Sequence, residues 1–428
     1  MKVLLSVFVI SVTFSIGAGA QTLDDRLRTL EEAQKKLEQT IQEQKKLIQE
    51  LKAEISRRQS PATQQKTPGL LNPAIGMTVD ADAYHSNLSE ANLEEVNIPG
   101  YLSGVEREFI KGFNLREAEM NLYAPVDPYF NLYTTIPITE KGVELEEAYF
   151  VTTSLPAGLQ LKGGKFRSSF GRLNAFHPHA WDFVDAPLAY RAFLGEEGLN
   201  EAGLQLTYLP RLPVFAVVGI EALQGQNPVL FRSDAGWGIH AFSAFAKASL
   251  DFASDHTLLF GASVTGGRTE TGTVIPETQF DGRSTLYDVE LTYKWKPSKQ
   301  KSLTIQTEYL FRHQSGDIVE AAGAVLDPLR RSQDGWYIQA VRQWGRWRVG
   351  SRFDVLGILR DGYSLSGLGI DFGKHPFRLT AALEFNPTEF SRLRLQYNYD
   401  RSARSNKVNN EILIQALFTI GAHAAHPF

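Results

Sequence analysis

From residue 72 onward, apolar and polar residues alternate with a period of two over much of the chain. In the segment 377–385, odd positions carry Phe, Leu, Ala, Leu and Phe, whereas even positions carry Arg, Thr, Ala and Glu. The segments 303–312, 347–355 and 393–399 show the same pattern. Because successive side chains of a β-strand point to opposite faces, each segment predicts a strand with one apolar and one hydrated face.

The connections between these strands are of two kinds. Short turns on one side and long loops on the other distinguish an outer-membrane β-barrel from a soluble sandwich, whose strands also alternate. Counting upward and downward segments predicts an all-β transmembrane barrel of about 16 antiparallel strands around an aqueous lumen. The short connections lie at 125–128, 156–158, 210–213, 253–255 and 345–346, and the long ones at 86–100, 168–199, 224–235, 268–281, 314–333, 359–375 and 401–409.

Composition excludes several other classes. The absence of cysteine excludes a disulfide framework and cysteine nucleophiles, and a net charge of −4 gives no overall bias toward nucleic acid. After the first 20 residues there is no run of 18 or more apolar residues, which excludes a helical membrane protein. The chain has neither a Gly-rich phosphate loop nor a Gly-x-Ser-x-Gly motif, so we expect no enzymatic activity and no cofactor.

The first 71 residues are predicted to form three segments ahead of the barrel. Lys2 precedes an apolar stretch over 3–16 that ends at Ala18-Gly19-Ala20, the pattern of a cleaved signal peptide. Leu and Ile then recur at alternating spacings of three and four, which predicts a periplasmic coiled coil; a single amphipathic surface helix is the alternative. A polar, Pro-containing linker follows. The predicted boundaries are signal peptide 1–20, coiled coil 21–58, linker 59–71 and barrel 72–428.

The chain ends on an amphipathic strand and an aromatic residue. Ile412, Ile414 and Phe418 face one way, Gln415 faces the other, and the last residue is Phe428. This ending resembles the C-terminal signal of outer-membrane barrels. The resemblance implies that Phe418 and Phe428 are recognised by the barrel-assembly machinery.

Four segments carry a more specific resemblance: Gly164–Asn174, His177-Pro178-His179, Gly195–Asn200 and Gly421–Phe428. With the coiled coil and the barrel, they resemble the phosphate-selective porin family, and within it an uncharacterised group labelled zinc-regulated outer-membrane proteins. The resemblance implies a homotrimeric porin in the outer-membrane bilayer. Because a coiled coil stands where an energy-coupled receptor has a globular plug, active uptake is not expected.

The segment 168–199 is the longest connection on the loop side and is rich in charge. In porins, a loop folded into the lumen narrows it, and its charged residues select ions. We therefore predict a constriction loop, with Asp182, Asp185, Glu196 and Glu197 facing Arg167 and Lys165; a loop that only covers the barrel mouth is the alternative. The residues predicted at the constriction are Lys165, Arg167, Arg172, His177, His179, Asp182, Asp185, Arg191, Glu196 and Glu197.

Basic residues at lumen-facing positions concentrate in the last third of the barrel. An excess of arginine in the wall predicts a slight preference for anions. The alternative is that these charges pair with Asp288, Glu290, Glu308, Asp354 and Glu384 and only stiffen the wall. The predicted wall residues are Arg312, Arg346, Arg348, Arg352, Arg378, Arg392 and Arg394.

His177 and His179 are two residues apart, so in extended chain both imidazoles point the same way. With Asp182 or Asp185 they form a candidate zinc site; the alternative is that both rings hydrogen-bond to neighbouring groups. The sequence therefore predicts a porin for passive diffusion of small hydrophilic solutes. A zinc-linked channel and a structural tether to the peptidoglycan are the alternatives.

Overall fold

The computed structural model describes residues 28, 34–35, 73–89, 95–106, 109–232, 236–272, 278–320, 325–403 and 407–421. The predicted signal peptide, linker and C-terminal Phe428 lie outside these residues. The predicted coiled coil does too, apart from Arg28, Gln34 and Lys35, which are helical. These four features stay predictions.

In the described part of the chain, the main sheet contains 18 strand segments. Two of them, β6 (Gly142–Val143) and β17 (Leu368–Gly369), are two residues long. A separate hairpin is formed by β2 (Glu95–Ile98) and β3 (Leu102–Glu106). The other 16 strands are β1 (Ala74–Ser86), β4 (Gly112–Pro125), β5 (Phe130–Thr139), β7 (Glu147–Thr152), β8 (Leu159–Arg167), β9 (Asn200–Tyr208), β10 (Phe215–Leu223), β11 (Ala241–Ala253), β12 (His256–Gly272), β13 (Thr278–Ser298), β14 (Lys301–Glu320), β15 (Val325–Trp344), β16 (Trp347–Leu365), β18 (Phe377–Thr388), β19 (Ser391–Asp400) and β20 (Asn409–Gly421).

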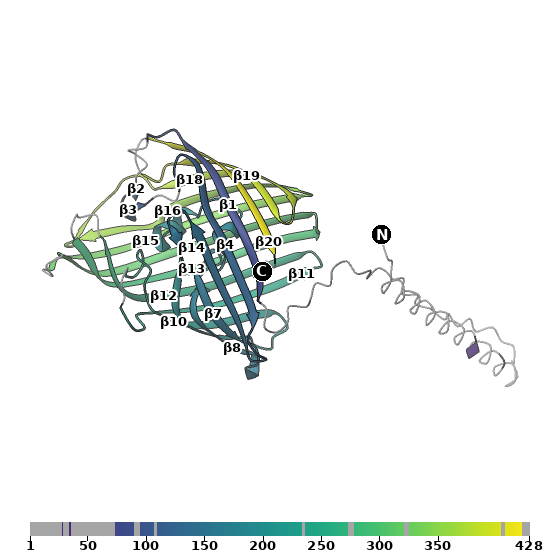
Figure 1. The fold of residues 1–428 in the computed structure, drawn as a ribbon. Coiled ribbons are helices and arrows are strands. Elements are labelled where there is room, and N and C mark those ends of the chain that lie inside the picture. Colours follow the sequence, from purple (N-terminus) through teal and green to yellow (C-terminus); the bar gives the residue numbers. More distant parts are fainter. Residues whose placement is uncertain are drawn as a thin grey trace, which may run out of the picture. The chain divides into compact units, whose positions relative to one another are not determined.

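These 16 strands close into one antiparallel barrel (Figure 1). Each strand pairs with its neighbour in the chain, and β1 closes the ring by pairing with β4 on one side and β20 on the other. In the closing pair, Val79 lies opposite Phe418 and Ala83 opposite Ile414. The predicted barrel of about 16 strands is thereby confirmed.

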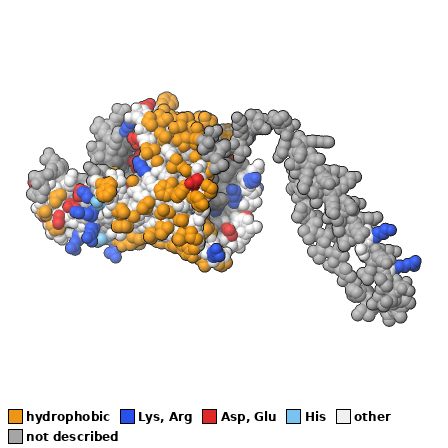
Figure 2. Space-filling view, turned by 60° about the horizontal axis from the view of Figure 1, so that its bottom comes forward, with side chains coloured by type: hydrophobic (Ala, Val, Ile, Leu, Met, Phe, Trp, Pro, Cys, Tyr) orange, Lys and Arg blue, Asp and Glu red, His pale blue; other side chains and the backbone are white. Residues whose placement is uncertain are grey.

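The barrel wall has an apolar outer face and a polar inner face. In β19, Leu393, Leu395 and Tyr397 are exposed outside, whereas Arg394 and Gln396 are buried inside. The strands β18 and β20 alternate in the same way. Figure 2 shows hydrophobic side chains gathered over the barrel surface. The alternation of the sequence thus separates a face suited to lipid from a predominantly polar inner face.

Short turns and long loops fall on opposite ends of the barrel, as predicted. Three of the predicted loops are nevertheless largely strand: β12 and β13 leave only 273–277 between them, β14 and β15 leave only 321–324, and β16 runs to Leu365. Apolar residues occur in these stretches without a regular period of two, so they lack the alternation by which a strand is recognised in sequence; Phe280, Ile318, Leu329 and Tyr363 are instead buried together in one cluster. The stretches form hydrogen-bonded hairpins rather than irregular loops.

The hydrophobic core of the barrel lies in its interior. The connection 168–199 contains three short helices, η3 (Leu173–Ala175), η4 (Pro178–Ala180) and α2 (Leu188–Leu194). Its buried side chains, including Phe170, Leu188 and Phe193, form one cluster with the inward-facing wall residues Leu310 and Leu356. Within the described residues, no helix is long and apolar enough to cross a membrane.

Candidate functional site

The connection 168–199 enters the barrel and is held there by carboxylates of the wall. The hydroxyl group of Ser168 and the backbone N–H of Ser169 (2.9 Å) both donate hydrogen bonds to the carboxylate of Glu221 in β10. The N–H groups of Arg172 and Leu173 donate to Glu308 of β14, at 2.8 and 3.1 Å. Because three of these four donors are backbone N–H groups, the wall fixes the path of the loop largely independently of its side chains.

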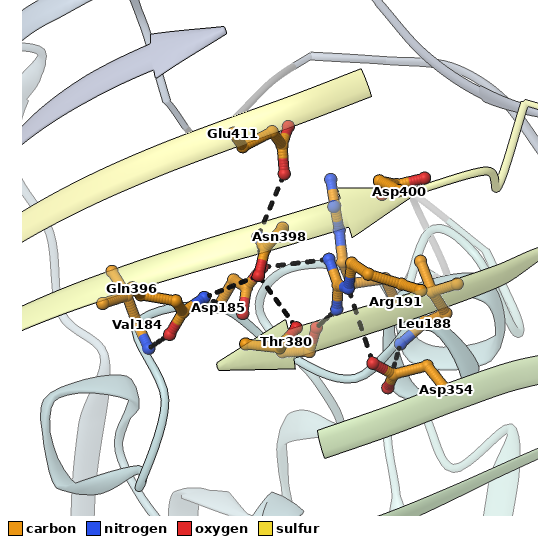
Figure 3. A network of polar contacts seen from close by, with 12 residues as sticks. Val184, Asp185, Leu188, Arg191, Asp354, Thr380, Gln396, Asn398, Asp400 and Glu411 are labelled. Carbon is orange, nitrogen blue, oxygen red and sulfur yellow. Dashed lines mark hydrogen bonds and ion pairs between the residues drawn. The ribbon is translucent and has the colours of Figure 1, made fainter. Parts of the chain in front are cut away.

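Asp185 lies at the centre of a network of contacts between loop and wall (Figure 3). Its carboxylate pairs with Arg352 at 2.7 Å and with Arg378 at 3.0 Å. The side-chain amides of Gln396 and Asn398 each donate a further hydrogen bond of 2.8 Å. Burial alone would raise the pKa of Asp185, but the two guanidinium groups hold that pKa well below its usual range.

Other wall arginines bind the loop through its carbonyl oxygens. Arg394 donates to the carbonyl of Trp181 (2.9 Å) and pairs with Glu384 (2.7 Å). Arg392 donates to the carbonyl of His179 (3.0 Å). Further contacts of this kind join Arg312 to the Ala192 carbonyl (3.4 Å) and Arg378 to the Ala186 carbonyl. Arg348 instead pairs with the carboxylates of Asp182 in the loop and Glu384 in β18.

The prediction that the acidic loop residues face Arg167 and Lys165 is wrong for Asp182, Asp185 and Glu196, which pair with other arginines, whereas Glu197 does lie near Arg167. Arg167 pairs with Glu146 of the wall and donates to the carbonyl of Glu197 (3.0 Å). Lys165 is exposed and donates to the carbonyl of Leu145 (2.8 Å). The remaining pair, Arg191 with Glu196 (2.7 Å), lies within the loop itself. Arg346 is exposed in the turn between β15 and β16, away from the loop.

His177 and His179 meet glutamates of the wall rather than Asp182 or Asp185. The Nε2 atom of His177 lies 2.8 Å from Glu147, and its Nδ1 atom lies 3.2 Å from both Glu146 and Glu119. The Nδ1 atom of His179 lies 3.3 Å from Glu119. Burial by itself lowers the pKa of His177, but its three glutamate partners raise that pKa well above the usual range. The three glutamates therefore favour the protonated form of His177.

Imidazole and carboxylate atoms in this cluster are close enough to share a metal ion. Ligand atoms of Glu119, Glu146 and His177 lie within 4.8 Å of one another, as do those of Glu117, Glu119 and His179. Two imidazoles with carboxylates are a donor set that suits zinc and similar ions, although His177 would have to lose its proton. The predicted co-ligands Asp182 and Asp185 are instead paired with arginines.

The four glutamates of this cluster were not predicted from the sequence. Glu117 and Glu119 occupy alternate positions of β4, and Glu146 and Glu147 precede or begin β7. Acidic residues at alternate positions of a predicted strand indicate a charged lumen face. Glu146 and Glu147 lie 31 and 30 residues before His177 in the chain, so their contact with that histidine is a product of the tertiary fold.

A cavity of about 440 Å³ lies beside the loop, between it and the wall formed by β4 to β12. Lys162, Arg172 and Lys247 line it together with Glu119 and Glu147. A second cavity, of about 720 Å³, lies at the short-turn end. Its charged lining residues are Arg346, Arg348, Glu384, Glu389 and Arg392.

No protein-family model matches this chain. An uncharacterised protein of Aquifex aeolicus is 39% identical over 381 residues, which cover 83% of this chain and 80% of that protein.

Three solved structures share the fold at 8–10% identity, and each comparison covers 82% of this chain. They are the anion-selective porin from Comamonas acidovorans (TM-score 0.51, 99% of that chain), a loop-deletion mutant of OmpT, an outer membrane protein of Vibrio cholerae (0.51, 99%), and the outer membrane channel DcaP of Acinetobacter baumannii (0.50, 97%).

Proposed function

Because the chain belongs to the same family as the Aquifex aeolicus protein and has the fold of outer-membrane porins, we propose that it is an outer-membrane porin. It lets small hydrophilic solutes or ions diffuse passively through the barrel. The observation that carries this proposal is the loop 168–199, which enters a polar lumen and lies beside a cavity lined by charged residues. The charged loop in the lumen acts as the constriction.

Conductance of the purified protein in planar lipid bilayers tests this function. Discrete, reproducible current steps that are ohmic at low voltage support a porin. A correctly folded barrel that gives no steps over a wide range of protein concentration contradicts it. Folding is checked independently by heat-modifiable migration in gels, so an inactive preparation is not mistaken for a closed barrel.

We also propose a slight preference for anions, but on different residues from those expected. Arg352, Arg378 and Arg394 are paired with Asp185, Asp354 or Glu384, so they add little net charge. The cavity beside the loop instead has an excess of basic residues: Lys162, Arg167, Arg172 and Lys247 line it against the carboxylates Glu119 and Glu147, even though Lys247 also pairs with Glu290 of the wall. Reversal potential in a salt gradient tests this preference, and a cation-selective channel would contradict it.

A second function, a metal-linked channel, is favoured by the two imidazole–carboxylate groups that share Glu119. We expect Zn²⁺ to reduce conductance of the wild-type protein and to have no effect on a His177→Ala/His179→Ala variant. Equal inhibition of both proteins contradicts this second function.

Assembly as a homotrimer, insertion by the barrel-assembly machinery through Phe418 and Phe428, and a periplasmic rod remain proposals. Phe418 is exposed on the outer face of β20, where a bilayer or another protein can reach it. Chemical cross-linking of the native protein tests the trimer. The structural tether to the peptidoglycan stays a prediction, because the segment that would form it lies outside the described residues.

A further inference from the structure

Three carboxylates lie together on the inner face of β13 and β14, apart from the histidine cluster. Asp288 and Glu290 are two positions apart in β13, and Glu290 lies directly opposite Glu308 of β14. One carboxylate oxygen from each residue lies within 4.8 Å of those from the other two, and all three residues are buried. Like charges placed directly opposite one another in a sheet destabilise it unless another group compensates them.

Existing partners satisfy these carboxylates unequally. Glu308 accepts hydrogen bonds from the N–H groups of Arg172 and Leu173 and from the hydroxyl of Tyr337. Glu290 lies 3.4 Å from the ammonium group of Lys247.

Asp288 is 1% exposed, and neither of its carboxylate oxygens accepts a hydrogen bond from the residues that the structure describes. The same holds for the Oε2 atom of Glu290. A buried ionised carboxylate without a hydrogen-bond donor is unfavourable, because the desolvation of its charge is not compensated. These unmatched oxygens therefore point to a positively charged ligand.

We propose that Asp288, Glu290 and Glu308 bind one divalent cation of the calcium class. Carboxylate oxygens are the ligands that hard cations prefer, and three of them converge here without any imidazole. Ser263 of β12 lies directly opposite Asp288 and adds a hydroxyl to the same face. The histidine cluster, in contrast, offers the nitrogen ligands that suit zinc.

The loop closes over this site. A Cβ atom at Gly171 would lie 2.7 Å from the Oε2 atom of Glu308 and 3.5 Å from the carboxyl carbon of Asp288. Gly171 also has a φ of +60°, in the left-handed region. Because Glu308 holds the next two backbone N–H groups, a cation bound here fixes the start of the loop to the wall. The site does not depend on the proposed transport function.

Titration of the refolded, metal-free full chain with Tb³⁺, followed by Ca²⁺ competition, tests the site. Tyr337, whose hydroxyl donates to Glu308, is placed to sensitise Tb³⁺ luminescence. We expect one Tb³⁺ per chain, displaced by Ca²⁺, and at least a tenfold loss of affinity in Asp288→Asn/Glu290→Gln. Asp281→Asn, which removes a partly exposed carboxylate from the same strand, serves as the matched control and retains binding.

Two results would overturn the proposal. One is an absence of ion binding to folded wild-type protein, which would mean that the carboxylates share protons instead. The other is undiminished binding by the double variant. If the double variant does not fold, the single, nearly isosteric Asp288→Asn variant provides the same comparison.

Discussion

Replacing Asp185 by alanine is expected to release the loop 168–199 from the barrel wall. The substitution leaves Arg352 and Arg378 buried without their shared carboxylate and also removes the acceptor for Gln396 and Asn398. Breaking a buried ion pair by removing one partner costs about 3–5 kcal/mol. Because every barrel strand keeps its ladder of hydrogen bonds, we expect this free energy to be lost from loop docking rather than from the barrel.

A loss of that size shifts the docking equilibrium on the order of a hundredfold to several thousandfold. In planar bilayers, Asp185→Ala is expected to give larger and noisier single-channel currents than the wild type, and the loop should become sensitive to protease. Glu196→Gln is the control, because the pair of Glu196 with Arg191 lies within the loop and is partly exposed. Its effect should be within about 1 kcal/mol.

Unchanged conductance and protease resistance of folded Asp185→Ala would refute this reasoning. The pH dependence gives a second check. Since the pKa of Asp185 is lowered in the folded protein, its contribution is fully present above the ordinary aspartate pKa of about 3.9 and is lost as the pH falls through the lower, folded value. The wild-type loop should therefore stay docked from pH 7 down to about pH 4.

Two further predictions concern selectivity and the lipid-facing wall. Lys247→Glu should move the reversal potential in a salt gradient toward cation selectivity, because Lys247 lines the cavity beside the loop. Lys374→Glu lies outside that cavity and should leave the reversal potential unchanged. No shift in the Lys247 variant would contradict the proposed role of the cavity. Leu395→Arg, on the exposed outer face of β19, should destabilise the folded barrel in lipid vesicles by about 2–4 kcal/mol. Leu368→Arg, in the connection after β16, should destabilise it by less than about 1 kcal/mol. Equal effects of the two substitutions on urea-induced unfolding would contradict the assignment of the apolar band.

The sequence predicts the wall of this barrel better than its interior. In β19, Leu395 and Arg394 are assigned to the correct faces because alternation is a local property of the strand. The boundaries of the loop 168–199 are likewise correct, since Arg167 ends β8 and Asn200 begins β9. Both results depend on residues close together in the chain.

The partners of the loop could not be predicted in the same way. Asp185 meets Arg352 and Arg378, which are 167 and 193 positions further along the chain, and not Arg167, which is closer in sequence. Which wall residues a loop reaches depends on where the barrel closes and how its strands are staggered. A single sequence contains no local signal for either quantity.

The strands differ greatly in length around the ring. β13 has 21 residues and β9 has 9, which at about 3.3 Å per residue correspond to roughly 70 Å and 30 Å along the strand. About 9–11 tilted residues are enough to cross a bilayer, so the hairpins of β12 to β16 extend well beyond it on the loop side. The rim of the barrel on the loop side is consequently asymmetric. The extended hairpins of β12 to β16 shield one half of the entrance, and a diffusing molecule approaches most freely over the lower rim formed by β7 to β10.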